Sequence, residues 1–320
     1  MKTAIALIGA LVCALTEGAA QAQTWPDQPV KLIVPFGPGG NTDLAARITA
    51  ERLSSVIGQR FLVENRLGAS GAIAAEYVAK SPPDGYTFFI GTTPQISVLP
   101  LIAKVNFDPH KDFVPVAIIA TNPFVLGIHP SIPVKTLREF IDYVKARPGR
   151  LSYGSSGVGT IGHLCAASLL ARAGLTMTHV PYKSGPQGVS DLVGGQLQMY
   201  FGTATDIIPP MRAGKLTVLA VSSEKRFREI PEVPAIAETY PGFNLLSWSG
   251  ILAPARTPAH VIERLARQTS RVVMEPAVAE RIQAVGLDPS GIALGEFAEL
   301  IRKEHPLWVE VVNLAGAKLE

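Results

Sequence analysis

The sequence predicts an α/β protein of two lobes, each a mostly parallel sheet flanked by helices. Short runs of apolar residues alternate with segments of helical periodicity along the chain, which is typical of parallel sheets covered by helices. Two proline-bearing stretches, 116–130 and 229–258, lie where the chain would pass between lobes. At 320 residues the chain is long enough to build two hydrophobic cores.

The predicted elements follow from these local patterns. Apolar runs predict strands at 30–36, 60–64, 86–91, 114–120, 124–129, 151–154, 177–181, 198–201, 216–222 and 248–253. Helical periodicity predicts helices at 43–57, 71–79, 136–146, 161–173, 185–193 and 258–273. In the first of these helices Leu44, Ile48 and Val56 share one face, which only Arg52 interrupts.

The two proline-bearing stretches place the lobe boundaries. Residues 23–123 and 248–320 are predicted to form lobe 1, and residues 124–247 are predicted to form lobe 2. The chain then passes twice between the lobes. Two such connections make a hinge, and a ligand bound between the lobes favours closure.

Residues 1–22 have the layout of a cleavable signal peptide. Lys2 supplies a positive start, residues 4–15 are almost entirely apolar, and Ala20-Gln21-Ala22 is a small-x-small cleavage pattern. The apolar run is too short to span a bilayer. We therefore expect export to the periplasm and a mature chain in which Cys165 has no partner for an internal disulfide.

The charge pattern and the composition exclude two classes of protein. The chain has 29 basic and 26 acidic residues, a net charge of +3, and no block of Lys or Arg of the kind that nucleic-acid binding requires. Its hydrophobic fraction of 47% excludes intrinsic disorder. No nucleic-acid partner is expected.

Two glycine-rich loops, one in each predicted lobe, join a strand to a helix. They are residues 34–43 and residues 153–160. Each places several backbone N–H groups at a helix N-terminus, where an anion is stabilised. Because ligands in open α/β sheets bind beyond the carboxyl ends of the strands, the loops are predicted to face each other across a carboxylate site. Ordinary turns between strand and helix, which also use Gly and Ser, are the alternative.

Patterns for catalysis, metals and cofactors are missing from the sequence. The first loop lacks the last glycine of a dinucleotide fingerprint, and there is no Gly-x-Ser-x-Gly motif. The six histidines show no metal-binding spacing. We expect no catalytic residue, metal or cofactor. His163 is open between ligand contact and a local structural role, and Cys165 is expected in the core.

Taken together, several segments resemble a known family. In order they are Trp25-Pro26, 30–43, 63–66, 68–71, 83–87, 107–109, 111–113, 153–160, His163-Leu164, 179–183, 212–216 and 248–258. In this order and spacing they resemble the Bug-type periplasmic solute-binding proteins, the extracytoplasmic receptors of tripartite tricarboxylate transporters. The resemblance covers essentially the whole mature chain. It implies the two-lobed periplasmic-binding-protein (Venus-flytrap) fold, a carboxylate ligand, no cofactor, and large and small membrane subunits as partners of a monomer.

The resemblance, with the loop analysis, implies a set of ligand-binding residues. From the first loop they are Pro35, Phe36, Gly39, Gly40, Asn41, Thr42 and Asp43. From the second loop and its helix they are Ser155, Ser156, Gly157, Thr160 and His163. From neighbouring strand ends they are Thr92, Thr93, Tyr182, Lys183, Gly202 and Thr203. For Tyr182 packing at a strand end is the alternative, and for Lys183 a solvated side chain.

One position departs from the family pattern. Gly202 stands where many relatives carry an acidic residue that could read a ligand amine, so its presence favours a plain organic dicarboxylate or an aromatic carboxylate over an amino acid. Trp248, at the second crossing, is expected to pack there and to report closure. Two other functions stay open. One is a sensory receptor of the same fold that signals to a membrane kinase, and the other is an exported α/β enzyme.

Overall fold

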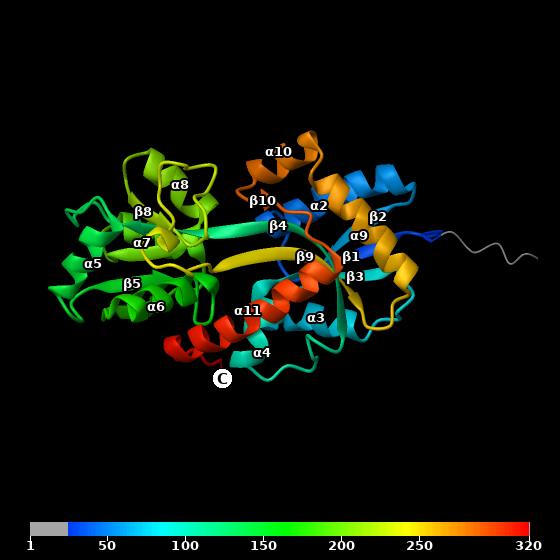
Figure 1. The fold of residues 1–320 in the computed structure, drawn as a ribbon, viewed down its shortest axis with the longest axis horizontal. Coiled ribbons are helices and arrows are strands. Elements are labelled where there is room, and N and C mark those ends of the chain that lie inside the picture. Colours follow the sequence, from blue (N-terminus) through cyan, green and yellow to red (C-terminus); the bar gives the residue numbers. More distant parts are fainter. Residues whose placement is uncertain (1–24, 320) are drawn as a thin grey trace, which may run out of the picture.

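Two groups of strands and helices, joined by two long strands, form the molecule (Figure 1). The computed structural model describes residues 25–319, so the predicted signal peptide lies outside the described residues. The strands are β1 (Val30–Val34), β2 (Phe61–Asn65), β3 (Thr87–Thr92), β4 (Phe113–Ile128), β5 (Ser152–Ser155), β6 (Thr178–Pro181), β7 (Met199–Thr203), β8 (Thr217–Val221), β9 (Leu246–Pro254) and β10 (Asp288–Pro289). The helices are α2 (Asn41–Ile57), α3 (Ala72–Ala79), α4 (Leu99–Ile102), α5 (Leu137–Lys145), α6 (Ile161–Ala173), α7 (Gly185–Val193), α8 (Ala204–Arg212), α9 (Ala259–Val273), α10 (Pro276–Ala284) and α11 (Leu294–Ala315). The predicted two-lobed α/β class is confirmed.

The strands form one sheet in the order β2-β1-β3-β9-β4-β7-β5-β6, with β8 and β10 paired to β4. Within the first lobe β2, β1 and β3 are parallel, and within the second β6, β5 and β7 are parallel. β9 is antiparallel to both β3 and β4, and β4 is antiparallel to β7 and β8. The two crossing strands therefore run in opposite directions between the lobes.

β4 corrects one expectation from the sequence. Residues 114–120 and 124–129 are predicted as two strands, but the structure has a single strand from Phe113 to Ile128. β9 pairs with it through the predicted break, where Pro123 lies opposite Leu246. Because a proline also restricts the residue before it to extended conformations, the backbone stays extended at this point. The lobes are thus connected by a paired strand rather than by a loop.

Helices cover both faces of the sheet in the first lobe. Neighbouring residues of β1 point to opposite faces, so Leu32 packs with α2 and α9 while Ile33 packs with α3 and the first half of α11. On the first face Leu53 of α2 and Leu265 of α9 are fully buried. The result is the three-layer arrangement expected of a sheet whose strands are buried on both sides.

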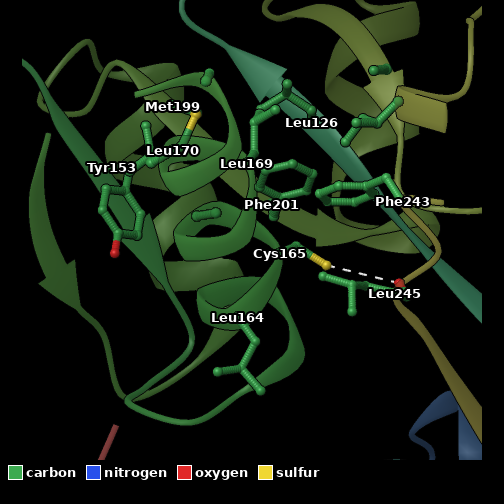
Figure 2. Close-up of a cluster of buried hydrophobic side chains, with 14 of the residues drawn as sticks. Leu126, Tyr153, Leu164, Cys165, Leu169, Leu170, Met199, Phe201, Phe243 and Leu245 are labelled. Atoms are coloured by element: carbon green, nitrogen blue, oxygen red, sulfur yellow. Dashed lines mark hydrogen bonds between the residues drawn. The ribbon is translucent and has the colours of Figure 1, made fainter. Parts of the chain in front are cut away.

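Cys165 lies in the core of the second lobe (Figure 2). Its side chain is fully buried in the same cluster as Leu126, Phe201 and Phe243, and its Sγ is 3.8 Å from the carbonyl oxygen of Leu245. Burial raises the pKa of the Cys165 thiol, which disfavours the thiolate that a nucleophile needs. The expectation that Cys165 is a core residue is confirmed.

Four helices were not predicted from the sequence: α4, α8, α10 and α11. Prolines inside α8 and α11 are signals of a helix end, and they obscured the periodicity. α11 contacts both lobes, because Phe297 packs in the first lobe while Trp308 and Val312 pack against α6 in the second. Among the described residues, no helix is long and apolar enough to cross a membrane.

Candidate functional site

A cavity of about 530 Å³ lies between the lobes, where β1, β3, β5 and β7 end. Its polar lining residues are Asn41, Thr42, Ser70, Thr92, Gln95, Asn122, Ser156, Thr160, Lys183, Thr203 and Ser247. Its other lining residues are Phe36, Pro94, Val98, Leu99, Ile102, Phe124, Val158, Gly159, Ile161 and Leu319. The position agrees with the rule that ligands of α/β sheets bind beyond the carboxyl ends of the strands.

The first loop is shaped by a buried carboxylate behind it. Asp43, in the first turn of α2, accepts hydrogen bonds from the Gly39 N–H (2.9 Å), Arg47 Nε (2.9 Å) and Asn65 Nδ2 (2.7 Å). Burial opposes ionisation of Asp43, but these hydrogen bonds hold the pKa of its carboxyl below the usual value. The charge of Asp43 is therefore used to hold the loop, and its side chain does not line the cavity.

The second loop has a similar construction. His163, in the first turn of α6, accepts a hydrogen bond from the Gly159 N–H at 3.2 Å between nitrogen atoms. Ser155 Oγ donates to the Gly157 carbonyl (3.0 Å) and shares a hydrogen bond of 2.7 Å with His179 Nε2. Ser155 and His163 thus lie behind the loop, while Ser156 and Thr160 face the cavity.

A third helix N-terminus reaches the cavity from α8. Thr203 precedes this helix, lines the cavity and donates from Oγ1 to Asp206 Oδ2 at 2.8 Å. Gly202 lies outside the lining, and a Cβ atom at this position would lie 2.7 Å from Ile207 Cγ1. An acidic side chain here would require Ile207 to move. α2, α6 and α8 therefore direct their N-termini toward one region, where backbone donors and helix dipoles favour an anion.

The cavity wall formed by β3 and the π-helical turn after it, Pro94–Val98, was only partly predicted. Thr92 Oγ1 donates to Gln95 Oε1, and Gln95 Nε2 donates to the Ser70 carbonyl at 3.1 Å. Thr93 instead accepts the Trp248 N–H at 3.0 Å, so its hydroxyl holds the second crossing and not the cavity. Trp248 is buried there, as expected.

Other lining residues come from parts of the chain that the sequence did not associate with a site. Asn122 and Ser247 lie on the two crossing strands, and the Asn122 Oδ1 atom is buried without a hydrogen-bond partner among the described residues. Leu319 reaches the cavity from the C-terminal end, where its N–H donates to the Ile102 carbonyl at 2.9 Å. No local motif marks these residues, because tertiary packing alone brings them together.

The structure sorts the predicted site residues into two groups. Those that line the cavity are Phe36, Asn41, Thr42, Thr92, Ser156, Thr160, Lys183 and Thr203. Those that lie outside its lining are Pro35, Gly39, Gly40, Asp43, Thr93, Ser155, Gly157, His163, Tyr182 and Gly202. Tyr182 donates its hydroxyl to Asp191 Oδ2 at 2.8 Å, which agrees with the packing alternative. Direct contact with a ligand stays a prediction for every one of them.

The charges of the lining are one-sided. Among the described residues, Lys183 is the one lining side chain with a formal charge, and no acidic side chain lines the cavity. A large part of the remaining lining is apolar, including Phe36, Leu99 and Phe124. The described residues hold no group of three or more His, Cys, Asp or Glu side chains that could bind a metal. The cavity can therefore hold an anionic group by hydrogen bonds and a hydrocarbon body by apolar contact.

Gly39→Val is expected to weaken ligand binding about a hundredfold, or about 2.7 kcal/mol, which exceeds its effect on folding. Gly39 has a φ of +87°, which costs other residues about 1–2 kcal/mol, and there is nothing within 4 Å of the added Cβ. The matched control is Gly174→Val at the end of α6, where φ is +63° and the Cβ also meets nothing within 4 Å. Titration calorimetry and chemical denaturation of both variants measure the two effects. If the two variants lose the same stability and Gly39→Val keeps the wild-type affinity, the first loop has no role in binding.

The two-lobed α/β fold, with a cavity lined from both lobes, defines a solute-binding protein of the periplasmic-binding-protein fold. The chain belongs to the tripartite tricarboxylate transporter family receptors, whose family model matches residues 45–316. This confirms the resemblance seen in the sequence.

Individual relatives are similar to this chain over nearly its whole length. The chain is 35% identical over 311 residues to a UPF0065 protein encoded in the tcbD-tcbE intergenic region of a Pseudomonas species, covering 96% of this chain and 93% of that one. A structure of R. palustris Rpa4515 with adipate is similar with a TM-score of 0.79 and 36% identity, covering 92% of this chain and all of the other. A structure of MatC from Rhodopseudomonas palustris with bound malate has a TM-score of 0.73 and 29% identity, covering 90% of this chain and all of the other.

Proposed function

We propose that this protein is an exported receptor that captures a small carboxylate between its lobes and delivers it to the large and small membrane subunits of a tripartite permease. One observation carries the proposal: the N-termini of α2, α6 and α8 meet at a cavity whose lining holds one lysine and, among the described residues, no acidic side chain. The similarity to structures with adipate and malate supports a carboxylate as the ligand class.

Hydrogen bonds and helix N-termini can supply enough free energy to bind a carboxylate without an arginine. A hydrogen bond to a charged group contributes about 1.5–3 kcal/mol, and a helix N-terminus adds about 0.3–1 kcal/mol. Four or five such contacts can offset the cost of association and leave the roughly 8 kcal/mol of a micromolar complex. We expect the hydroxyls of Thr42 and Ser156, one from each lobe, to donate two of these hydrogen bonds.

The lining also supports a narrower ligand class. In the part of the chain that the structure describes, Lys183 is the single lining side chain with a formal positive charge, whereas apolar side chains such as Phe36, Leu99 and Phe124 form much of the remaining surface. A tricarboxylate would bury two further charges against that surface, at a high desolvation cost. An organic acid with one or two carboxylates and an aliphatic or aromatic body therefore fits better.

A thermal-shift panel tests this proposal. The mature chain is heated with mono-, di- and tricarboxylates, aromatic acids and amino acids, each beside its neutral amide as the matched control. A ligand at 100 times its Kd stabilises the native state by about 2.7 kcal/mol, which raises Tm by several degrees. We expect the rise for carboxylates with an apolar body and not for their amides. No rise with any acid, or equal rises with the amides, would overturn the proposal.

Delivery to a permease needs a separate experiment. Membrane vesicles that contain a tripartite permease are expected to take up the radiolabelled acid only when the ligand-loaded protein is added. Uptake that does not depend on the protein would leave ligand capture in place and remove the permease from the proposal.

A further inference from the structure

Two histidines form a stacked pair behind the second loop. The rings of His163 on α6 and His179 on β6 lie 4.0 Å apart between centroids and are nearly parallel, with an interplanar angle of 12°. Tyr153 of β5 stacks on His179 at 4.9 Å. Neither histidine lines the cavity, so the pair is not explained by ligand contact.

Each ring is tied to one end of the loop. His163 Nδ1 accepts the Gly159 N–H at 3.2 Å, and His179 Nε2 shares a hydrogen bond of 2.7 Å with Ser155 Oγ. Between these two anchors lie residues 156–158, of which Ser156 and Val158 line the cavity. The loop is therefore held at both of its ends by the stacked pair.

The first loop shows that this construction recurs in the other lobe. Gly39 and Gly159 both have positive φ values, +87° and +75°, and both lie four residues before a side chain that accepts their N–H. That side chain is Asp43 in the first loop and His163 in the second. The His163 ring thus holds the second loop by accepting a glycine N–H, as the Asp43 carboxylate holds the first loop.

We infer that His163 and His179 are positioning residues, which hold residues 155–159 in the conformation that presents Ser156 and Thr160 to the ligand. The inference rests on the proposed function, because it takes the cavity between the lobes as the ligand site. It adds that binding depends on two side chains that do not touch the ligand.

The construction requires His163 to be neutral, since a protonated Nδ1 has no lone pair to accept the Gly159 N–H. Burial, and next the neighbouring His179, lower the pKa of His163 to about 4, and burial lowers that of His179. The titratable groups that face the pair are the two rings themselves and Tyr153. Among the described residues, no carboxylate, lysine or arginine forms a hydrogen bond or ion pair with either ring. Protonation of His163 at acid pH therefore removes the acceptor that holds the Gly159 N–H.

The experiment compares three variants with the wild type, with adipate as the probe. His163→Asn places an amide oxygen near the position of Nδ1 but cannot titrate, and His163→Leu removes the acceptor. His260→Asn, at an exposed histidine of α9, is the matched control. Hydrogen exchange of the Gly159 amide is measured without ligand, and the Kd of adipate is measured at pH 7.5 and 3.5.

We expect His163→Leu to lose protection of the Gly159 amide and to bind adipate at least tenfold more weakly, while His163→Asn stays close to wild type at pH 7.5. At pH 3.5 the wild type should bind about fourfold more weakly than His163→Asn, because about three quarters of a group with a pKa of about 4 is then protonated. The His163→Asn reference cancels the titration of adipate itself.

Two results would overturn the inference: a protected Gly159 amide in His163→Leu, or the same pH profile for the wild type and His163→Asn. Absence of adipate binding in every variant at both pH values would count against adipate as the ligand, whereas the proposed function is tested by the whole thermal-shift panel. The exchange of the Gly159 amide would still decide whether His163 holds the loop.

Discussion

Replacing Thr42 and Ser156 together with alanine is expected to weaken carboxylate binding by at least about 2 kcal/mol, or about 30-fold. The two hydroxyls line the cavity from different lobes, beside the N-terminus of α2 and the loop before α6. We expect each hydroxyl to donate to a ligand carboxylate, and a hydrogen bond to a charged group contributes about 1.5–3 kcal/mol. Titration calorimetry with an acid that stabilises the protein in the thermal-shift panel measures the loss.

The matched control for this double variant is Thr178→Ala with Ser190→Ala. Both side chains are exposed in the second lobe, on β6 and α7, and neither lines the cavity. The control pair should bind as the wild type does. If Thr42→Ala with Ser156→Ala also binds as the wild type does, the two loops do not form the ligand site.

Glu304→Gln is expected to increase the free energy of unfolding by about 2–3 kcal/mol at pH 8 and to change it little at pH 4.5. Glu304 lies on α11 between two tryptophans, and its Oε2 accepts from Trp248 Nε1 (3.2 Å) and Trp308 Nε1 (3.4 Å). Burial raises the pKa of its carboxyl to about 7, although the two indole donors oppose the rise. The folded protein therefore favours the neutral acid at this position.

The sign of the pH dependence follows from the two pKa values of Glu304. In the unfolded chain the carboxyl ionises near 4.5, and in the folded chain near 7. Between these values the unfolded chain gives up the proton that the folded chain retains, so stability falls as the pH rises through this window and stays low above it. Glutamine is neutral at every pH and avoids this cost.

Chemical denaturation at pH 4.5 and pH 8 checks the Glu304 prediction. Glu310→Gln, at an exposed position of the same helix, is the control and should change stability little at either pH. A Glu304→Gln protein that is less stable at pH 8 would mean that the hydrogen bonds from Trp248 and Trp308 to the carboxylate outweigh its burial.

Much of the fold could be predicted from the sequence, because periodicity and capping act over a few residues. The predicted strand at 30–36 and helix at 161–173 are found as β1 and α6. α8 and α11 were missed because their prolines signal a helix end that tertiary packing overrides. The division of β4 failed because a partner strand, distant in sequence, keeps its backbone extended.

The class of the protein, its two glycine-rich loops and the place of those loops at helix N-termini could be predicted, since all three depend on local residue patterns. Which side chains face the cavity depends instead on packing between distant segments. Asp43 and His163 turn behind their loops to accept Gly N–H groups, while Gln95, Asn122 and Ser247 enter the lining from distant segments. The reason is physical: the direction of a side chain is set by the partners that satisfy it, and those partners meet only when the chain has folded.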